Sequence, residues 1–317
     1  MVNRSVSAVK VAKKRITVHK LPGALRNGPV QHIKNPVPHV PPDLFQLHSL
    51  CAFIGPRGKG KTHAMVNLTL KYLHEGSFNR VFLITPTYKS NRIFHVLDPD
   101  ENDVFENINN IYGALNTIEL ETAKDAKKYK GFKEYLSAYK KYSRGKAITP
   151  TEDTLLRNNQ YKKPNYIPRP SPLLIVDDMS HTDIYSTSHS NPFPNLCLRH
   201  RHINDGIGIT IFMATQTFKT GIPKAIRQNI QQFFLWPTND LSQLDCIYEE
   251  IGSLCSKEVF EDMYRRATRG KHNFLTIDSN AKHHLLQFRK NFDTILVPHN
   301  IEGDSDNDES KDDESKE

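Results

Sequence analysis

The feature that most constrains this chain is a glycine-rich stretch at residues 49–65, SLCAFIGPRGKGKTHAM. It follows the pattern G-x-x-x-x-G-K-[ST], and the four fixed positions are filled by Gly55, Gly60, Lys61 and Thr62. An apolar run precedes the pattern and apolar residues at helical spacing follow it, so a buried strand, a loop and a helix are expected in that order. This context predicts a phosphate-binding loop, not a chance glycine-rich turn.

Each residue type in the pattern has a physical task. Glycines let backbone N–H groups close round phosphate oxygens, and Gly55 is expected to let the chain leave the strand sharply. Lys61 is expected to reach the β- and γ-phosphates, and Thr62 to offer its hydroxyl to Mg²⁺. The cofactors implied are therefore ATP and Mg²⁺. The predicted nucleotide-binding residues form one run: Gly55, Pro56, Arg57, Gly58, Lys59, Gly60, Lys61 and Thr62.

A second stretch, residues 172–179 (PLLIVDDM), runs from apolar residues straight into two acids. A strand that ends in an acid is where a phosphate-loop protein places its Walker B carboxylate, which holds the metal shell. We expect Asp177 to take that role opposite Thr62, and Asp178 to accept a proton from the attacking water. The alternative for Asp177 is an ordinary acid that caps a helix.

A third apolar stretch, residues 208–214, leads into Thr215 and Gln216. A polar residue at the end of a strand beside Walker B can sense the γ-phosphate or orient the water, and Gln216 suits that task. Further strands are expected at residues 80–86 and 233–236, two helices at 240–269, and a closing strand pair at 273–278 and 285–288. The alternation predicts an α/β fold whose sheet is mostly parallel, with helices on both faces.

The region from residue 91 to residue 170 loses this alternation, and we interpret it as an inserted helical segment between core elements. Within it, residues 124–146 carry nine Lys or Arg and two acids. Aromatic side chains recur there every three or four residues, which on a helix places them along one side. We expect them to pack onto the core while the lysines face water, and the alternative is a nucleic-acid contact. The aromatic residues are Tyr129, Phe132, Tyr135, Tyr139 and Tyr142.

The chain has 317 residues and a formal net charge of +8. The charge is unevenly distributed over three parts of the sequence. The first 40 residues hold eight Lys or Arg and no acid, whereas residues 302–317 hold nine acids and two lysines, which leaves +7 for the residues between. We expect a basic, irregular N-terminal arm over residues 1–43, with a short strand near 16–18, then an ATPase domain over 44–299. An acidic, disordered tail over 300–317 would follow.

Histidines and cysteines are not expected to bind a metal. His181, His189, His200 and His202 lack carboxylates or thiolates at zinc-ligand intervals. The four cysteines form no CxxC pair, which indicates reduced thiols in an intracellular protein. Apolar runs are too short for a membrane span and the N-terminus lacks the apolar core of a signal peptide, so a soluble protein without membrane contact is expected.

These motifs together resemble the FtsK–HerA superfamily, and within it the genome-packaging ATPases of poxviruses, other large DNA viruses, virophages and polinton-type elements. The resemblance covers about residues 44–296. Its second Walker B acid, Asp178, stands where Glu is common elsewhere in the superfamily. The segments that carry it are GPRGKGKT at 55–62, FLITPT at 82–87, LLIVDD at 173–178, RHRH at 199–202, MATQ at 213–216, IPKAIRQN at 222–229, NFLTID at 273–278 and LLQFRK at 285–290.

The resemblance implies a sheet with an additional strand between the P-loop and Walker B strands, in an order near 5-1-4-3-2. It implies a motor that couples ATP hydrolysis to translocation of double-stranded DNA, as a homo-oligomeric ring, and that packages a viral genome into a preformed capsid. Arg201, or else Arg199, would be the arginine finger for a neighbouring subunit, and Arg227 occupies a conspicuous family position. Capsid or portal-vertex proteins would be partners, at the virus assembly site or in the virion.

Three other interpretations stay open at this stage. A HerA-like cellular or plasmid translocase shares the motifs. A small-molecule kinase also begins with a P-loop, but has little use for the strand that ends in Gln216. A non-enzymatic nucleic-acid-binding scaffold would not need an intact Lys61 and Asp177.

Overall fold

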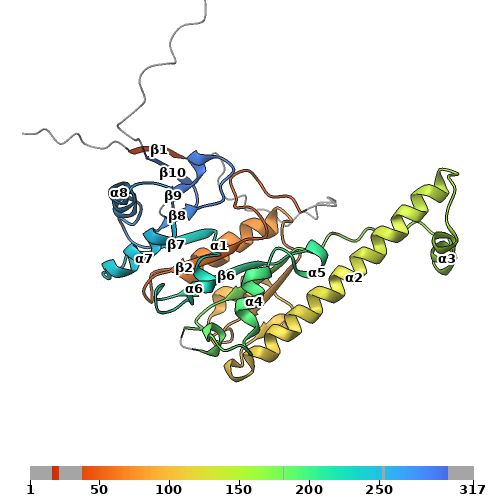
Figure 1. The fold of residues 1–317 in the computed structure, drawn as a ribbon, viewed down its shortest axis with the longest axis horizontal. Helices are drawn as coiled ribbons and strands as arrows, with labels where there is room; N and C mark the ends of the chain where they lie inside the picture. The colour runs from red at the N-terminus through yellow and green to blue at the C-terminus, as the bar shows by residue number, and fades with distance from the viewer. Residues whose placement is uncertain (1–15, 21–37, 181, 252–253, 299–317) are drawn as a thin grey trace, which may run out of the picture.

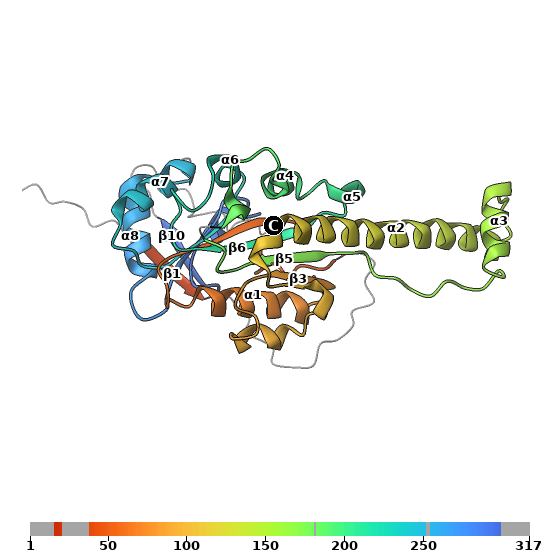
Figure 2. The same cartoon turned by 90° about the horizontal axis from the view of Figure 1, so that it is seen from below.

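The computed structural model describes residues 16–20 and 38–298, apart from residues 181 and 252–253. One ten-stranded sheet runs through the molecule in the order β1-β10-β9-β8-β7-β2-β6-β5-β3-β4 (Figure 1). Helix α1 covers one face, and α4, α6 and α7 cover the other (Figure 2). The molecule therefore has three layers, with a hydrophobic core on each side of the sheet.

One half of the sheet, from β7 to β4, is parallel, and its core strands are buried apolar runs, as sheets covered on both faces require. Its spatial order, β7-β2-β6-β5-β3, is the predicted order 5-1-4-3-2 when these strands are counted along the chain. A two-residue strand, β4 (Val104–Phe105), extends the edge beside β3. The five core strands are β2 (Leu50–Ile54), β3 (Arg80–Ile84), β5 (Pro172–Val176), β6 (Thr210–Thr215) and β7 (Gln232–Leu235).

The other half of the sheet is antiparallel. The predicted closing pair is confirmed as β8 (Leu275–Asp278) and β9 (Phe288–Lys290), although β9 lies slightly further along the chain than expected. Strand β10 (Thr294–Pro298) continues it and pairs in turn with β1 (Ile16–Lys20). The N-terminal region thus contributes an edge strand, where the sequence indicated a short strand. Residues 38–43 of the predicted basic arm form no helix or strand, and residues 1–15 and 21–37 of it lie outside the described residues, as does the acidic tail.

The helices of the body are amphipathic and cover the sheet. The two helices expected within residues 240–269 are confirmed as α7 and α8. The α-helices are α1 (Lys61–His74), α4 (Pro192–Arg199), α5 (Ile203–Gly206), α6 (Lys224–Arg227), α7 (Leu241–Ile251) and α8 (Lys257–Ala267). Short 3₁₀ turns are η1 (Arg92–Leu97), η2 (Glu101–Asp103), η3 (Ile108–Asn110), η4 (Asp183–Tyr185) and η5 (His284–Leu286). Among the described residues, no helix is long and apolar enough to cross a bilayer.

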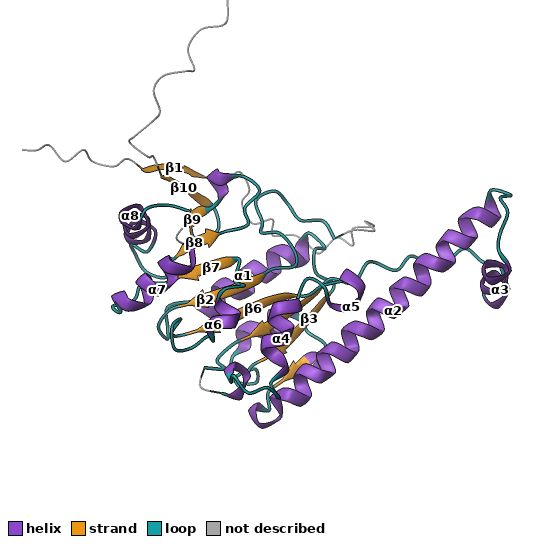
Figure 3. Ribbon diagram, viewed as in Figure 1, coloured by secondary structure: helices purple, strands orange, loops and turns teal. Residues whose placement is uncertain are grey.

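The insertion is a helical arm, as predicted, but its aromatic face is not where we expected it. Helix α2 (Ile111–Ser143) has 33 residues, and α3 (Pro150–Asn158) lies across its far end (Figure 3). Only the first part of α2 packs on the body, through Ile111, Leu115 and Ile118. The far part leaves the body, and Tyr135 packs there with Ala138 and Leu156 in a separate small core. The expectation that the aromatic side chains pack onto the body is therefore wrong. Helix α3 and the segment after it supply their apolar partners, such as Leu156 for Tyr135 and Tyr166 for Phe132.

Candidate nucleotide site

The glycine-rich loop joins β2 to α1 at the carboxyl edge of the sheet. Gly58 and Gly60 have φ angles of 75° and 96°, which side chains other than glycine rarely adopt. Helix α1 starts after Gly60 with no acid in its first turn and no side-chain cap on its free N–H groups. Unpaired N–H groups at the positive end of a 14-residue helix form a binding site for an anion.

Gly55 is required for a different reason than the one predicted. Its backbone does not take a positive φ, but a Cβ at this position would lie 2.5 Å from Cβ of Trp236. Trp236 follows β7, and its N–H donates to the carbonyl of Ile54 at 2.9 Å. The close contact between two neighbouring strands therefore excludes any side chain at Gly55, and the loop begins directly on the indole.

Lys61 is held at the centre of the loop. Its Nζ donates to the carbonyl oxygens of Gly55 at 2.7 Å and Pro56 at 3.0 Å, so the ammonium group lies inside the curve of the chain. Burial lowers the pKa of Lys61, and the charges of Asp177 and Asp178 act against this shift. A partly desolvated ammonium beside the helix N-terminus is placed to bind phosphate oxygens strongly.

Thr62 and Asp177 meet at the carboxyl edge of the sheet. The Thr62 hydroxyl donates to Oδ2 of Asp177 at 2.8 Å, although the two residues lie 115 positions apart. Burial and the charge of Asp178 raise the pKa of Asp177 to about 6, while the hydrogen bond from Thr62 acts to lower it.

These two oxygens fit Mg²⁺. Magnesium prefers oxygen ligands, and a hydroxyl and a carboxylate are ligands of that kind. Because the two oxygens lie 2.8 Å apart, Thr62 and Asp177 would hold the metal together. Among the described residues, no group of three or more His, Cys, Asp or Glu side chains could hold a different metal. His181 lies outside the described residues.

Asp178 and Gln216 lie at the ends of neighbouring strands. Asp178 has a φ of 53° and its side chain is exposed, in contrast to the buried Asp177 before it. Gln216 is also exposed and follows β6, the strand between the P-loop strand and the strand that ends in Asp177. The carbonyl of Thr215 accepts from the N–H of Gly55 at 3.2 Å, so Gln216 begins directly beside the loop. The two side chains project into solvent at the edge that carries Lys61.

Arg199 and Arg201 lie at the opposite edge of the sheet. Arg199 ends α4, and the carbonyl of the intervening His200 accepts from Ile209 just before β6 begins. A six-residue strand separates this end of β6 from Gln216, which corresponds to roughly 20 Å. Both arginine side chains are exposed, and among the described residues neither has an ion pair. They cannot reach the phosphate loop of their own chain.

Arg227 is engaged within the body. Its Nη1 donates to the carbonyl of Lys219 at 3.0 Å, its Nε lies 3.7 Å from Glu250, and its guanidinium lies over the ring of Phe218. These contacts hold the loop after β6 against α7. Arg227 therefore has a structural role in the body.

Two residues beside the loop had no signal in the sequence. Trp236 excludes a side chain at Gly55, and His272 lies against Gly60, with Nδ1 3.2 Å from the carbonyl of Lys59. Both come from segments about 180 to 210 positions further along the chain, so no local pattern connects them with the P-loop.

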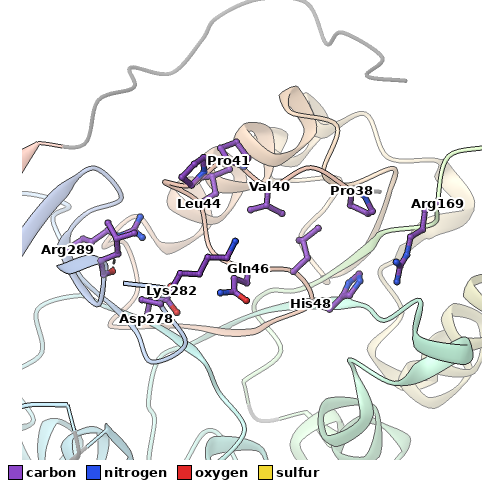
Figure 4. A pocket seen from close by; sticks show the side chains of 14 residues that line it. Pro38, Val40, Pro41, Leu44, Gln46, His48, Arg169, Asp278, Lys282 and Arg289 are labelled. Carbon is purple, nitrogen blue, oxygen red and sulfur yellow. Dashed lines mark hydrogen bonds between the residues drawn. The ribbon is translucent and has the colours of Figure 1, made fainter. Parts of the chain in front are cut away.

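A separate hollow of about 380 Å³ lies at the amino edge of the sheet, and no residue of the phosphate loop lines it. Figure 4 shows the side chains that do. Asp278 and the buried Arg289 line one end of it, and His48 and Arg169 the other. Burial and nearby Arg169 lower the pKa of His48 to about 4, so its ring is neutral at pH 7. This hollow takes no part in the phosphate site.

No protein-family model matches the sequence, and no curated protein does. The chain is similar to several solved structures. The genome packaging NTPase B204 from Sulfolobus turreted icosahedral virus 2, in complex with ATP-gammaS, is 12% identical over 78% of this chain and 98% of that one, with a TM-score of 0.43. EssC (ATPases 2 and 3) from Geobacillus thermodenitrificans is 13% identical over 81% of this chain and 41% of its own, with a TM-score of 0.40. The pCW3 conjugation coupling protein TcpA, monomer form with ATPgS, is 9% identical over 77% and 60%, with a TM-score of 0.41.

The class of the chain follows from its own geometry. A phosphate loop lies between a central parallel strand and a helix, and a buried aspartate at the end of β5 meets the loop threonine. Strand β6 lies between those two strands. This is the fold of the P-loop NTPases with an additional strand, as the sequence predicted.

Proposed function

We propose that the chain is an ATPase that couples hydrolysis to translocation of double-stranded DNA. The observation that carries the ATPase part is the bond from Thr62 to Asp177, beside Lys61 and a free helix N-terminus. These groups are what phosphoryl transfer requires: cations and N–H donors for the phosphates, and oxygen ligands for the metal.

The residues divide the chemistry as follows. Lys61 and the N–H groups of α1 bind the β- and γ-phosphates and hold the nucleotide in place. Thr62 and Asp177 would hold Mg²⁺, which would supply positive charge beside the phosphate oxygens. Asp178 is exposed at the same edge and accepts a proton from the attacking water, while Gln216 orients that water or senses the γ-phosphate.

Ring assembly is part of the proposal. Arg201, or else Arg199, is exposed at the edge opposite the loop of its own chain, so it serves as an arginine finger only in the site of a neighbour. Mixing two inactive variants tests this. Lys61→Ala and Arg201→Ala subunits together should recover part of the turnover, because some sites then combine an intact loop with an intact finger. A strictly monomeric protein with full DNA-stimulated turnover would refute the assignment.

We further propose that the DNA is a viral genome and that capsid or portal-vertex proteins are partners. The motif resemblance supports this reading, and it also allows a HerA-like cellular or plasmid translocase. Binding of the purified protein to empty capsids in preference to mature, DNA-filled ones would support packaging. Equal binding to both, or to neither, would favour the cellular alternative.

Translocation itself is tested by displacement of a third-strand oligonucleotide from a long linear duplex. Wild-type protein with ATP should release the oligonucleotide, and Asp178→Asn should not. Asp183→Asn is the matched control, since Asp183 is an exposed acid five positions further on. No release by the wild type, together with phosphorylation of a small acceptor, would replace the motor with a kinase.

A further inference from the structure

The positive charge of the body is concentrated in one element. Residues 123–170, which form the projecting part of α2, helix α3 and the return segment, carry thirteen Lys or Arg and four acids, a net charge of +9. The remaining residues of the body, 41–122 and 171–301, have a net charge of −2. We call residues 123–170 the α2–α3 arm. Because the rest of the body is nearly neutral, the arm is the part of the body that attracts a polyanion most strongly.

The arm is rigid and straight. The 33 residues of α2 make it roughly 50 Å long, of which roughly 30 Å projects from the body. Its root is fixed by charge as well as by packing: Arg80 binds Asp103 at 2.7 Å and Asp125 at 2.9 Å, and Nδ2 of Asn204 donates to Thr122 at 2.9 Å. These contacts join the root to the body, and from there the arm projects away from the sheet (Figure 2).

Near its root the arm forms one wall of a hollow of about 760 Å³. Lys127, Lys130 and Lys133 line it from α2, Arg169 lines it from the return segment, and Glu134 and Asp205 are the acids in its wall. The three lysines are exposed, and none has an ion pair with a described residue. Nη2 of Arg169 donates to the carbonyl of Gly206 at 2.8 Å, and its buried Nε has no hydrogen-bond partner among the described residues. The hollow thus gathers cations that the fold itself does not neutralise.

Gly131 marks the middle of this face. A Cβ added to it would meet no atom within 4 Å, so the fold gives no steric reason for a glycine. A glycine inside an exposed helix costs roughly 1 kcal/mol relative to alanine. Its lack of a side chain leaves the backbone between Lys130 and Lys133 open to close approach from outside.

We propose that the basic face of the α2–α3 arm binds the phosphate backbone of double-stranded DNA. This inference rests on the proposed function and names the element that holds its substrate. A duplex is a stiff rod that advances about 34 Å per turn, close to the projecting length of the arm. Lysines on a rigid helix match such a linear polyanion better than they match a compact acidic protein surface.

The position of the root connects this contact with the nucleotide site. Helix α2 packs on η4 and α4, which are the first elements after Asp177 and Asp178. Two packed elements therefore join the proposed DNA contact to the proposed nucleotide site.

Binding of a fluorescent random-sequence duplex of 30 base pairs to the full chain, measured by anisotropy across a range of salt concentrations, tests the proposal. Changing Lys127, Lys130 and Lys133 together to Gln should weaken binding at least tenfold, and should reduce the slope of log affinity against log salt by about 3. The matched control changes three exposed lysines of the body, Lys219, Lys224 and Lys282, to Gln, and none of these has an ion pair with a described residue. The control removes the same charge and should leave the slope nearly unchanged.

Each other outcome has a defined meaning. Equal weakening by both triple variants would overturn the arm as the contact and leave the proposed function standing. A wild type that binds no duplex at all, while it hydrolyses ATP, would overturn both. If the arm variant loses single-strand binding but binds the duplex as before, the arm contacts single strands and the proposal is overturned. If the arm variant has a lower molecular mass in solution and unchanged DNA affinity, the arm contacts a second copy of the chain and the proposal is again overturned.

Discussion

The carboxyl edge of the sheet and the α2–α3 arm differ in how their charged side chains are held. At the sheet edge Lys61 and Asp177 are partly or fully buried, bond to backbone or to Thr62, and have shifted pKa values. On the arm Lys127, Lys130 and Lys133 are exposed, and among the described residues they have no ion pair. The first region is organised before its ligand arrives, whereas the second offers charge that only an external polyanion neutralises.

The largest effect is expected when the buried cation of the sheet edge, Lys61, is removed. Lys61→Ala should lower ATP turnover on the order of 10²-fold or more, because a preorganised charge on the phosphates is lost in a site of low dielectric. DNA affinity at fixed salt should stay near that of the wild type. The measurement is phosphate release, with Lys89→Ala as the exposed control. A parallel loss of DNA affinity would break the division between the two regions.

Removing the buried carboxylate of Asp177 is expected to stabilise the fold and to abolish ATP hydrolysis. Its pKa is about 6 in the folded chain, above the ordinary value of 3.8, so the folded state binds the extra proton between these values. The free energy of unfolding therefore falls as pH rises from about 4 to 6. The loss caused by ionising Asp177 reaches its full size above about pH 6. Asp177→Asn should raise the free energy of unfolding at pH 7 by about 3 kcal/mol without metal, and by nothing near pH 4.

Urea unfolding at both pH values checks this prediction, with Asp183→Asn as the exposed control. The same variant should hydrolyse no ATP, since an amide is a poor replacement for a carboxylate as a ligand of Mg²⁺. A variant no more stable than the wild type at pH 7 would show that burial does not govern Asp177.

The arm has its own small core, and a truncation there should be felt locally. Leu156 is fully buried against Tyr135 and Ala138, away from the two cores that flank the sheet. Leu156→Ala should cost about 2 kcal/mol and increase hydrogen exchange in residues 135–161, while residues 61–74 keep their protection. ATP turnover without DNA should be unchanged. Faster exchange in α1 would mean that the arm and the body unfold together.

The smallest expected effect concerns the helix itself. Gly131→Ala should stabilise the arm by roughly 1 kcal/mol, because alanine favours the helix and the added Cβ meets no atom of the chain. DNA affinity should nevertheless fall if the duplex approaches the backbone there. Thermal unfolding and anisotropy measure the two effects. An arm variant that is more stable and binds DNA as well as the wild type would remove Gly131 from the contact.

Sequence reasoning located the elements that short local patterns define. The strand, loop and helix around Lys61 and the strand that ends in Asp177 both follow from short runs of residues, and the strand order followed from the family resemblance. Trp236 and His272 were missed because they meet the loop only through the fold. The aromatic face of α2 was placed wrongly because helical spacing shows that one side is apolar, but not whether α3 or the body covers it.

One measurement tests the central claim most directly: ATP turnover of the wild type and of Asp178→Asn, each with and without long double-stranded DNA. We expect DNA to raise turnover of the wild type, and we expect the variant to be inactive in both conditions although its Lys61, Thr62 and Asp177 are intact. Turnover that is indifferent to DNA, accompanied by phosphorylation of a small acceptor, would contradict the translocating motor.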